Sequence, residues 1–280
     1  SDDLVSISPS RLENFNKCPL HWFLDAHGAN DGSFSANLGT IVHQTVEKLA
    51  SDSAFDEASL WKSVESQWHT LAFEADWLER AAQRKAKLMI ANIVEYLNQA
   101  KAHNTRLLGS EMEFNFVEGR ANIRGKIDRI EMLEGGQVLV IDLKTGQRQP
   151  TANEAVHHSQ LGLYQLAFEA GALDQSLEAA LAGLTTDNSD AVAEVAQRGV
   201  RALTLAGAKL VLVGKDKLVQ REQPPIGPSG LREEFLRQIQ TATAGMADRV
   251  FVAQVDSHCT SENEYGSCKL HMIKAVSYVG

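Results

Sequence analysis

The strongest constraint on this chain is a change of hydrophobic pattern near residue 107. Before it, apolar residues recur at helical spacing, most clearly over residues 76–102. After it, the segments 107–119, 121–133 and 137–146 alternate or form short apolar runs, with glycines between them. Such a pattern predicts strands, and the turn Gly135-Gly136 suits a hairpin between the last two. The chain must therefore place helices against a sheet.

The remaining segments complete this architecture. Helical patterns are expected over residues 8–28, 38–50, 56–70, 153–171 and 229–247, and two more strands over 206–214 and 217–225. The order is helices, a strand meander, a helix, strands and a helix. We therefore expect an α/β fold, a central mixed sheet flanked by helices, with a helical N-terminal part beside it.

Composition excludes some classes of protein. No apolar run among the 280 residues approaches the ~20 needed to span a bilayer, and the N-terminus lacks the pattern of a signal peptide. Three cysteines imply no disulfide framework, so a cytoplasmic protein without membrane contact is expected. The net charge of −9 argues against nonspecific coating of nucleic acid, but it leaves room for a narrow basic groove or a metal bridging acids to phosphate.

The stretch VIDLKTG, residues 140–146, places a carboxylate and an ammonium on one face of a strand, because Asp142 and Lys144 are two residues apart. Across the hairpin, Asp128 shares its strand face with Ile130 and can approach Asp142. Two close carboxylates favour a divalent cation between them, and Lys144 could orient or help deprotonate a water. The alternative is a surface hairpin with ordinary ion pairs.

Other polar residues fit the same site. His43 lies one helical turn before Glu47, and Gln160 and Tyr164 are likewise spaced i, i+4. Each also has a structural interpretation: a helical histidine with its partners satisfied, a surface glutamine or a buried tyrosine.

Taken in order, five motifs resemble the RecB-type nucleases of the PD-(D/E)xK superfamily, from Ser8 to Cys268. They are SPSRLENFNKCPLHWFL, GTIVH, GKIDRIE, VIDLKTG and QLGLYQLA. Within that family, Trp22 after Cys18-Pro19 is most similar to the C-terminal nuclease domain of actinobacterial AdnB-like helicase–nuclease subunits. The resemblance implies the restriction-endonuclease-like α/β core.

The resemblance also implies roles for the residues. Mg²⁺ or Mn²⁺ would be bound by His43, Asp128, Asp142 and the backbone carbonyl of Leu143. Lys144 would position the hydrolytic water, while Gln160 and Tyr164 would support the active site and the DNA backbone. Glu113, on the strand before Asp128, is an accessory candidate.

Many such relatives hold an iron–sulfur cluster on four cysteines. Cys18, Cys259 and Cys268 match three of these positions, whereas the fourth falls on Glu262. A standard four-cysteine cluster therefore cannot form. We expect the cluster to have been lost; the alternative is a noncysteine fourth ligand, for which Glu262, His258 and His271 are the candidates.

We therefore expect a single nuclease domain over residues 1–280: a helical part (1–105) with His43, a catalytic sheet and helix (106–225), and a C-terminal helix with a cysteine-bearing tail (226–280). Its function would be metal-dependent hydrolysis of DNA, exonuclease rather than endonuclease, at single-stranded or duplex ends. A helicase motor would be the partner in end resection and double-strand break repair. The alternatives are a stand-alone exonuclease and a noncatalytic DNA-end scaffold.

Several charged residues remain outside this assignment. The basic run Arg84–Lys87 and the residues Lys215, Lys217 and Arg221 are expected to be solvated, with a DNA-facing strip as the alternative for the latter three. His157 and His158 are expected at the surface.

Overall fold

A computed structural model describes residues 4–27, 34–49, 56–71, 73–146, 149–184 and 190–254. Over these residues the strands form one six-stranded mixed sheet. Its members are β1 (Val5–Ile7), β2 (Arg106–Glu118), β3 (Ala121–Met132), β4 (Gln137–Lys144), β5 (Thr204–Leu212) and β6 (Val219–Gln223). The α/β class with a central mixed sheet is therefore confirmed.

The long strand β3 organises the sheet. One edge of β3 pairs with β2 along most of its length, antiparallel. The other edge pairs first with β1, parallel, and then with β4, antiparallel. Beyond β4, β5 runs parallel and β6 antiparallel. The hairpin between β3 and β4 turns at Gly135 and Gly136, both with positive φ, as the sequence predicted.

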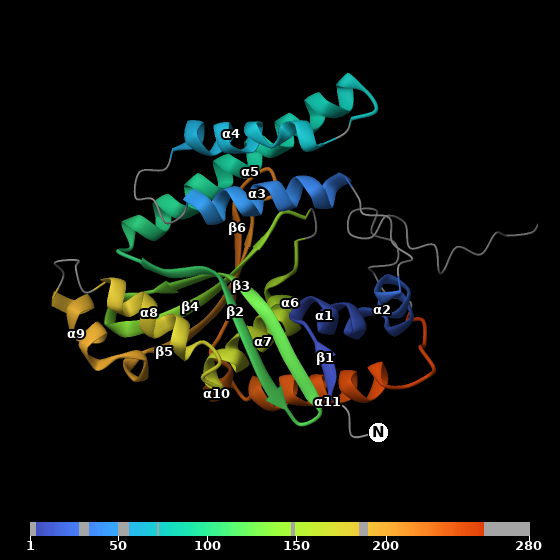
Figure 1. Cartoon of the computed structure of the whole chain (residues 1–280), viewed down its shortest axis with the longest axis vertical. Coiled ribbons are helices and arrows are strands. Elements are labelled where there is room, and N and C mark those ends of the chain that lie inside the picture. Colours follow the sequence, from blue (N-terminus) through green and yellow to red (C-terminus); the bar gives the residue numbers. More distant parts are fainter. Residues whose placement is uncertain are drawn as a thin grey trace, which may run out of the picture.

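Helices cover both faces of the sheet (Figure 1). One face packs against α3 (Phe34–Leu49), α4 (Glu57–Ser66) and α5 (Asp76–Ala102), whose apolar residues form one core cluster with Ile141 and Leu143 of β4. The other face packs against α1 (Pro9–Lys17), α7 (Ser159–Glu169) and α11 (Leu231–Met246), and Val138 and Val140 belong to this second cluster. Because successive side chains of β4 point alternately into these two clusters, Asp142 points to the same face as Val138 and Val140.

Two expected helices are each divided. The segment 8–28 breaks at Cys18 into α1 and α2 (Pro19–Ala26), since Pro19 cannot continue the hydrogen-bond ladder of α1 and instead begins a new helix. The segment 153–171 divides at His157 and His158 into α6 (Ala152–Val156) and α7. The strand β1 and the helices α8 (Asp174–Leu184) and α9 (Asp190–Arg198) were not anticipated, and α10 (Ile226–Ser229) is a single turn before α11.

The long helix α5 carries charged side chains along its length. Of the described helices, none is long and apolar enough to cross a membrane.

Candidate active site

The acids predicted from the hairpin lie on neighbouring strands at the end of the β3–β4 pairing. Arg129 pairs with Ile141, so Asp128 and Asp142 occupy the next position of the register. Asp128 Oδ2 accepts a hydrogen bond from the backbone N–H of Leu143 at 2.7 Å. This bond ties the two strands together between the two acids.

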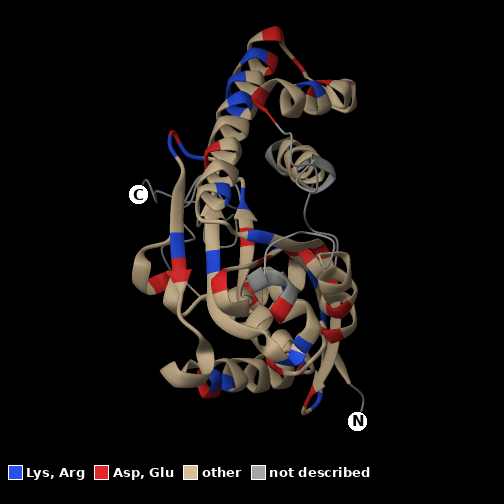
Figure 2. Cartoon of the chain, turned by 90° about the vertical axis from the view of Figure 1, so that its left-hand side faces the viewer, with Lys and Arg blue, Asp and Glu red and all other residues tan. Residues whose placement is uncertain are grey.

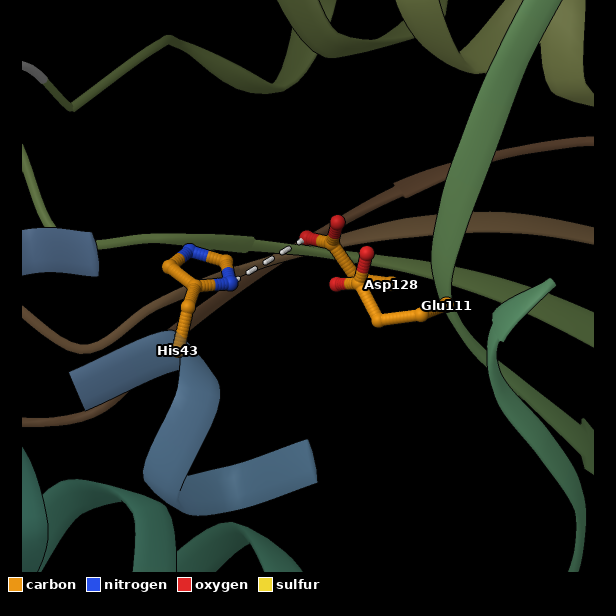
Figure 3. Close-up of side chains that lie close together, drawn as sticks. All are labelled: His43, Glu111 and Asp128. Carbon is orange, nitrogen blue, oxygen red and sulfur yellow. Dashed lines mark ion pairs between the residues drawn. The ribbon is translucent and has the colours of Figure 1, made fainter. Parts of the chain in front are cut away.

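Asp128 faces helix α3, where it meets His43 and a further acid, Glu111 of β2 (Figure 3). One potential ligand atom from each of these residues lies within 4.8 Å of the other two. His43 Nδ1 is 3.9 Å from Asp128 Oδ2. The backbone carbonyl of Leu143 also interacts with the His43 ring. We call the three side chains the metal-side cluster.

The electrostatics of the metal-side cluster fit a divalent cation. Burial raises the pKa of Asp128 well above its usual range, and the negative charges of Asp142 and Glu111 raise it further. Burial lowers the pKa of His43, which keeps the ring neutral at neutral pH, the form that binds metals. An imidazole nitrogen and two carboxylates without a basic side chain among them are a suitable donor set for a divalent cation.

Glu111 is a residue that sequence reasoning missed. Its φ of 49° lies in the left-handed region, which is uncommon for glutamate and costs backbone energy. In the register of β2 and β3, Ser110 pairs with Arg129 and Met112 with Ile127, which places Glu111 opposite Asp128. Two like charges directly opposite each other are destabilising. The strand therefore adopts an unfavourable conformation at the cluster.

The expected accessory acid Glu113 does not join the cluster. Its side chain is 76% exposed and pairs with Lys126 at 3.3 Å. Glu111 and Glu113 of the motif EMEF are two residues apart and would share one face of a regular strand, so the sequence does not show which of them reaches Asp128. The pairing of β2 with β3 does, because it places Glu111 opposite Asp128.

The expected sharing of a strand face by Asp128 and Ile130 is wrong. Ile127 and Ile130 both pack into the cluster under α7, whereas Asp128, between them, faces α3. The regular alternation of β3 is therefore interrupted next to the strained residue Glu111. The interruption lets an acid reach α3 from a strand whose neighbouring residues fill the opposite core.

The second acid, Asp142, belongs to a different group of side chains under helix α7. Lys144 Nζ lies 2.9 Å from Asp142 Oδ2. Gln160 donates from Nε2 to Asp142 Oδ1 at 2.7 Å and accepts from Lys144 Nζ at 2.6 Å through Oε1. Tyr164 completes the group, since its hydroxyl is 3.4 Å from Asp142 Oδ1 and 2.7 Å from Gln160 Nε2. We call these four residues the lysine-side network.

Charge in the lysine-side network is fixed by its surroundings. Burial opposes the charge on Lys144, but Asp142 and Glu13 more than offset this and hold the pKa of Lys144 above its usual value. Burial and the charge of Asp142 raise the pKa of Tyr164, so its hydroxyl keeps its proton. A raised pKa favours the charged form of Lys144 at neutral pH, and of the two roles that the sequence left open this form suits the orientation of a water.

The structure thus brings together His43 with Asp128, and Asp142 with Lys144, Gln160 and Tyr164. Asp142 is not one of the three residues of the metal-side cluster; one of its oxygens accepts from Gln160, and the other lies beside Lys144.

Helix α1 contributes an acid that the sequence did not single out. Glu13 is half-buried, with Oε1 at 2.6 Å from Lys17 Nζ and 3.5 Å from His158 Nε2. Burial would raise the pKa of Glu13, but the positive charges of His158, Lys144 and Lys17 outweigh this and lower it. These residues line a cavity of about 260 Å³ that also reaches Lys144.

The surface prediction for His158 is wrong, because only 11% of its side chain is exposed. His157 is 46% exposed and pairs with Glu234, as a surface residue can. The break between α6 and α7 turns one histidine inward toward Glu13 and the other outward.

Helix α3 passes close to the end of β4 at Gly39. A Cβ on Gly39 would lie 2.6 Å from Thr145 Oγ1, so a side chain there would require the Thr145 hydroxyl or the helix to move. His43 lies one turn further along the same helix.

Of the expected cysteine positions, only Cys18 lies within the described residues. It is buried at the break between α1 and α2, and its Sγ is 3.5 Å from the backbone nitrogen of Gln254. Cys259, Cys268 and Glu262 lie outside the described residues, so the expectation about an iron–sulfur cluster stays a prediction.

A mixed sheet with a histidine, two acids and a buried acid–lysine pair at one strand end is the arrangement of a metal-dependent nuclease. Residues 6–273 match the model of the PD-(D/E)XK nuclease superfamily. The chain belongs to this superfamily.

Two solved structures are similar in chain path. One is a protein from Eubacterium rectale described as a candidate exonuclease, with 10% identity and a TM-score of 0.43 over 91% of this chain and 92% of that chain. The other, SSO0001, has 14% identity and a TM-score of 0.28 over 73% and 83%. A search of curated proteins finds no match to this sequence. The family assignment rests on the sequence match.

Proposed function

We propose that this protein is a divalent-metal-dependent deoxyribonuclease that hydrolyses phosphodiester bonds. The observation that carries the proposal is the pair of adjacent strand acids in different surroundings: Asp128 beside a neutral histidine and a second acid, and Asp142 beside a charged lysine. Phosphodiester hydrolysis needs both a cation at the phosphate and an oriented water, and the two surroundings suit these two tasks.

His43, Glu111 and Asp128 would hold Mg²⁺ or Mn²⁺, with the Leu143 carbonyl as a further oxygen ligand. Asp142 would add negative charge to the metal site from the other face of the sheet, because its charge already raises the pKa of both Asp128 and His43. When bound, such an ion polarises the phosphodiester and lowers the pKa of a bound water.

The protein's own groups would do the rest. Lys144 donates to Gln160 Oε1 and forms an ion pair with Asp142, and an ammonium has three N–H donors, so it could also donate to a water or a phosphate oxygen. Gln160 holds the lysine and the acid at once, and Tyr164 supports both Gln160 and Asp142. The network therefore keeps Lys144 in one orientation and keeps its charge available where negative charge develops on phosphate.

The same proposal extends to the biological setting. Family membership and the acidic net charge support a nuclease module that is supplied with DNA by a helicase motor during end resection and break repair in the cytoplasm, as in the AdnB-like subunits that the motifs resemble. Exonuclease action on single-stranded or duplex ends is the proposed mode. A stand-alone exonuclease is the alternative within the same fold.

The test is digestion of end-labelled single-stranded DNA with Mg²⁺ or Mn²⁺ and with EDTA. Wild-type protein should cleave only with metal, and Asp142→Ala should abolish cleavage. The matched control is Glu222→Ala, which removes an acid that is 76% exposed on the edge strand β6 and should leave cleavage unchanged. A wild type that neither cleaves DNA nor binds Mn²⁺ would instead favour a noncatalytic scaffold.

A further inference from the structure

The outer face of helix α5 carries an aromatic and three basic residues in a row. Trp77 is 64% exposed, and Arg80, Arg84 and Lys87 are exposed beside it. Spacings of three, four and three residues place all four on one side of the helix. We call this row the α5 stripe.

The α5 stripe is unusual for a chain with a net charge of −9. From residue 77 to 91, the exposed positions of α5 are these four and Ala91, none of which is acidic. Within the described part of the chain, neither Arg80 nor Arg84 forms an ion pair. Asp76, the first residue of α5, is an exposed acid one turn before Arg80, and beyond it the exposed charges of α5 up to residue 91 are all positive.

The turn between β5 and β6 connects the α5 stripe to the active site. Asn92 of α5 donates from Nδ2 to the carbonyls of Val213 and Lys215 at 2.9 and 2.8 Å, which fixes the turn against the helix. At its start, Val213 N–H donates to the carbonyl of Lys144 at 2.9 Å. Lys215 and Lys217 lie in this turn.

Figure 2 shows basic segments of α5 on the arm that projects beyond the sheet, and a loop with both basic and acidic residues beside the inner part of the arm. The α5 stripe and the two lysines of the turn, which flank the exposed Asp216, are thus two basic segments on α5 and on the turn held against it. Asn92 and Trp77 are separated by about 22 Å, at 1.5 Å rise per helical residue.

We propose that the α5 stripe and the β5–β6 turn bind the backbone of a single DNA strand entering or leaving the active site, with a base stacked on Trp77. The proposal deepens the proposed nuclease function and rests on it. Arg and Lys in a row suit a chain of phosphates, and an exposed tryptophan offers a stacking surface that any base can use.

A protein partner fits this surface less well. Protein interfaces have an apolar centre, whereas Trp77 is the sole large apolar residue that the described part of α5 exposes. The rest of the exposed row is cationic, apart from the small side chain of Ala91. At about 3.4 Å per nucleotide of a stacked strand, 22 Å corresponds to about six or seven nucleotides.

The first test measures binding of fluorescein-labelled oligo(dT) of 30 nucleotides by anisotropy in EDTA, where no cleavage occurs. Arg80→Gln with Arg84→Gln should weaken binding about tenfold. The slope of log Kd against log salt concentration should fall by about 1.4, at about 0.7 for each lost phosphate contact of a single strand. The control pair Arg198→Gln with Arg201→Gln removes the same charge from exposed positions around the end of α9 and should change neither quantity.

Trp77→Ala should weaken binding of the same oligonucleotide about tenfold without changing the salt slope, because stacking carries no charge. Cleavage with Mn²⁺ separates this proposal from the nuclease assignment. The Arg80/Arg84 double variant should raise KM for the 30-nucleotide strand but not for a three-nucleotide strand, whose length of about 10 Å is shorter than the rise of about 12 Å between Asn92 and Arg84.

Equal binding by the Arg80/Arg84 variant and its control would overturn the proposal even if the wild type is an active nuclease. Loss of duplex binding with unchanged single-strand binding, or an unaffected Trp77→Ala variant, would overturn the assignment to a single strand. Absence of cleavage by the wild type with a normal DNA affinity would contradict the nuclease assignment alone.

Discussion

Asp128 and Asp142 occupy adjacent positions on paired strands, yet their surroundings differ in the sign of the nearest charge. Asp128 lies opposite Glu111, faces a neutral histidine, and has its pKa raised by burial and by other carboxylates. Asp142 lies 2.9 Å from an ammonium and accepts a hydrogen bond from a buried amide.

The difference teaches how the two halves of such a site are built. In the lysine-side network each polar atom of Gln160 meets a partner within 2.7 Å, whereas Asp142 Oδ2 lies beside the ammonium of Lys144 but accepts no hydrogen bond from the described residues. The metal-side cluster contains no lysine or arginine side chain. The strained φ of Glu111 shows that the cluster is held in place at an energetic cost. Binding of a divalent cation would relieve the repulsion on one side of the site without rearranging the other.

The largest effect should come from Asp128→Asn, which removes the central carboxylate of the metal-side cluster. We expect Mn²⁺ affinity to fall by at least about 100-fold, since even outer partners of metal ligands contribute 10–100-fold. Cleavage should fall by about 1,000-fold or more. Isothermal titration with Mn²⁺ and single-turnover cleavage measure the two.

The same variant sharpens the comparison through its stability without metal. Asparagine keeps the shape of the side chain and removes the repulsion from Glu111 and Asp142. Asp128→Asn should therefore be as stable as the wild type or more so in EDTA, and less stable than the wild type in excess Mn²⁺. A variant destabilised equally in both conditions would mean that Asp128 is structural.

Lys144→Met should reduce cleavage by about 100- to 1,000-fold and leave Mn²⁺ affinity within about threefold. The methionine retains the length of the side chain but leaves Asp142 buried without its cation, so urea denaturation should show a loss of about 2 kcal/mol. Weakened Mn²⁺ binding in this variant would contradict the separation of the two halves.

Gln160→Leu should lower cleavage by about 10- to 100-fold, because the leucine fills the space but holds neither Lys144 nor Asp142. The matched variant is Gln165→Leu on the same helix, whose buried amide bonds to Gln223 and Pro224 away from the site. Both variants should lose stability, but only Gln160→Leu should reduce the single-turnover rate of the protein that remains folded.

Glu111→Gln should weaken Mn²⁺ binding by about tenfold, whereas Glu113→Gln should have no effect. The two residues are two positions apart on β2 and differ in surroundings, since Glu113 is 76% exposed beside Lys126. Equal effects would show that the register of β2 on β3 does not decide which acid serves the site.

The smallest effect concerns the pH dependence of stability in EDTA. The pKa of folded Asp128 is raised above about 3.9, its value in an unfolded chain, so the folded state binds this proton more tightly. The free energy of unfolding should rise as pH falls through the folded pKa and level off below about pH 3.9. Urea titrations of the wild type and Asp128→Asn, subtracted at each pH, should isolate this contribution.

His43 contributes with the opposite sign. Its pKa is lowered in the folded state, so its contribution to stability is complete above about pH 6.5 and is lost as pH falls toward the folded pKa. His43→Asn in the same titrations should remove this part of the curve.

Much of the fold could be predicted from the sequence because periodicity reports burial directly. The strands that carry Asp128 and Asp142 and the helix that carries Gln160 were found because their apolar residues recur with the period of their secondary structure. The three-residue strand β1 is too short to show a period, and helix α8 follows a glycine turn that does not distinguish helix from loop.

The site residues could be predicted where they depend on spacing along one strand or helix. They could not be predicted where they depend on the pairing of strands or the packing of helices. Asp142 and Lys144 share a strand face, and Gln160 and Tyr164 a helix face, and these pairs do meet. Glu111 and Glu13 reach the site from β2 and α1, through strand pairing and helix packing that no short-range pattern encodes. The break in the alternation of β3 could not be predicted from the sequence either, because it occurs beside the strained backbone of Glu111 on the neighbouring strand.

The contact between Gly39 and Thr145 has a consequence for anyone who redesigns this protein. A side chain at position 39 would first meet the Thr145 hydroxyl, so either that hydroxyl turns away or helix α3 moves from the end of β4. Because His43 is on the same helix, a movement of α3 would change its distance from Asp128. The size of cation that the proposed site could accept would then depend on a residue outside the site.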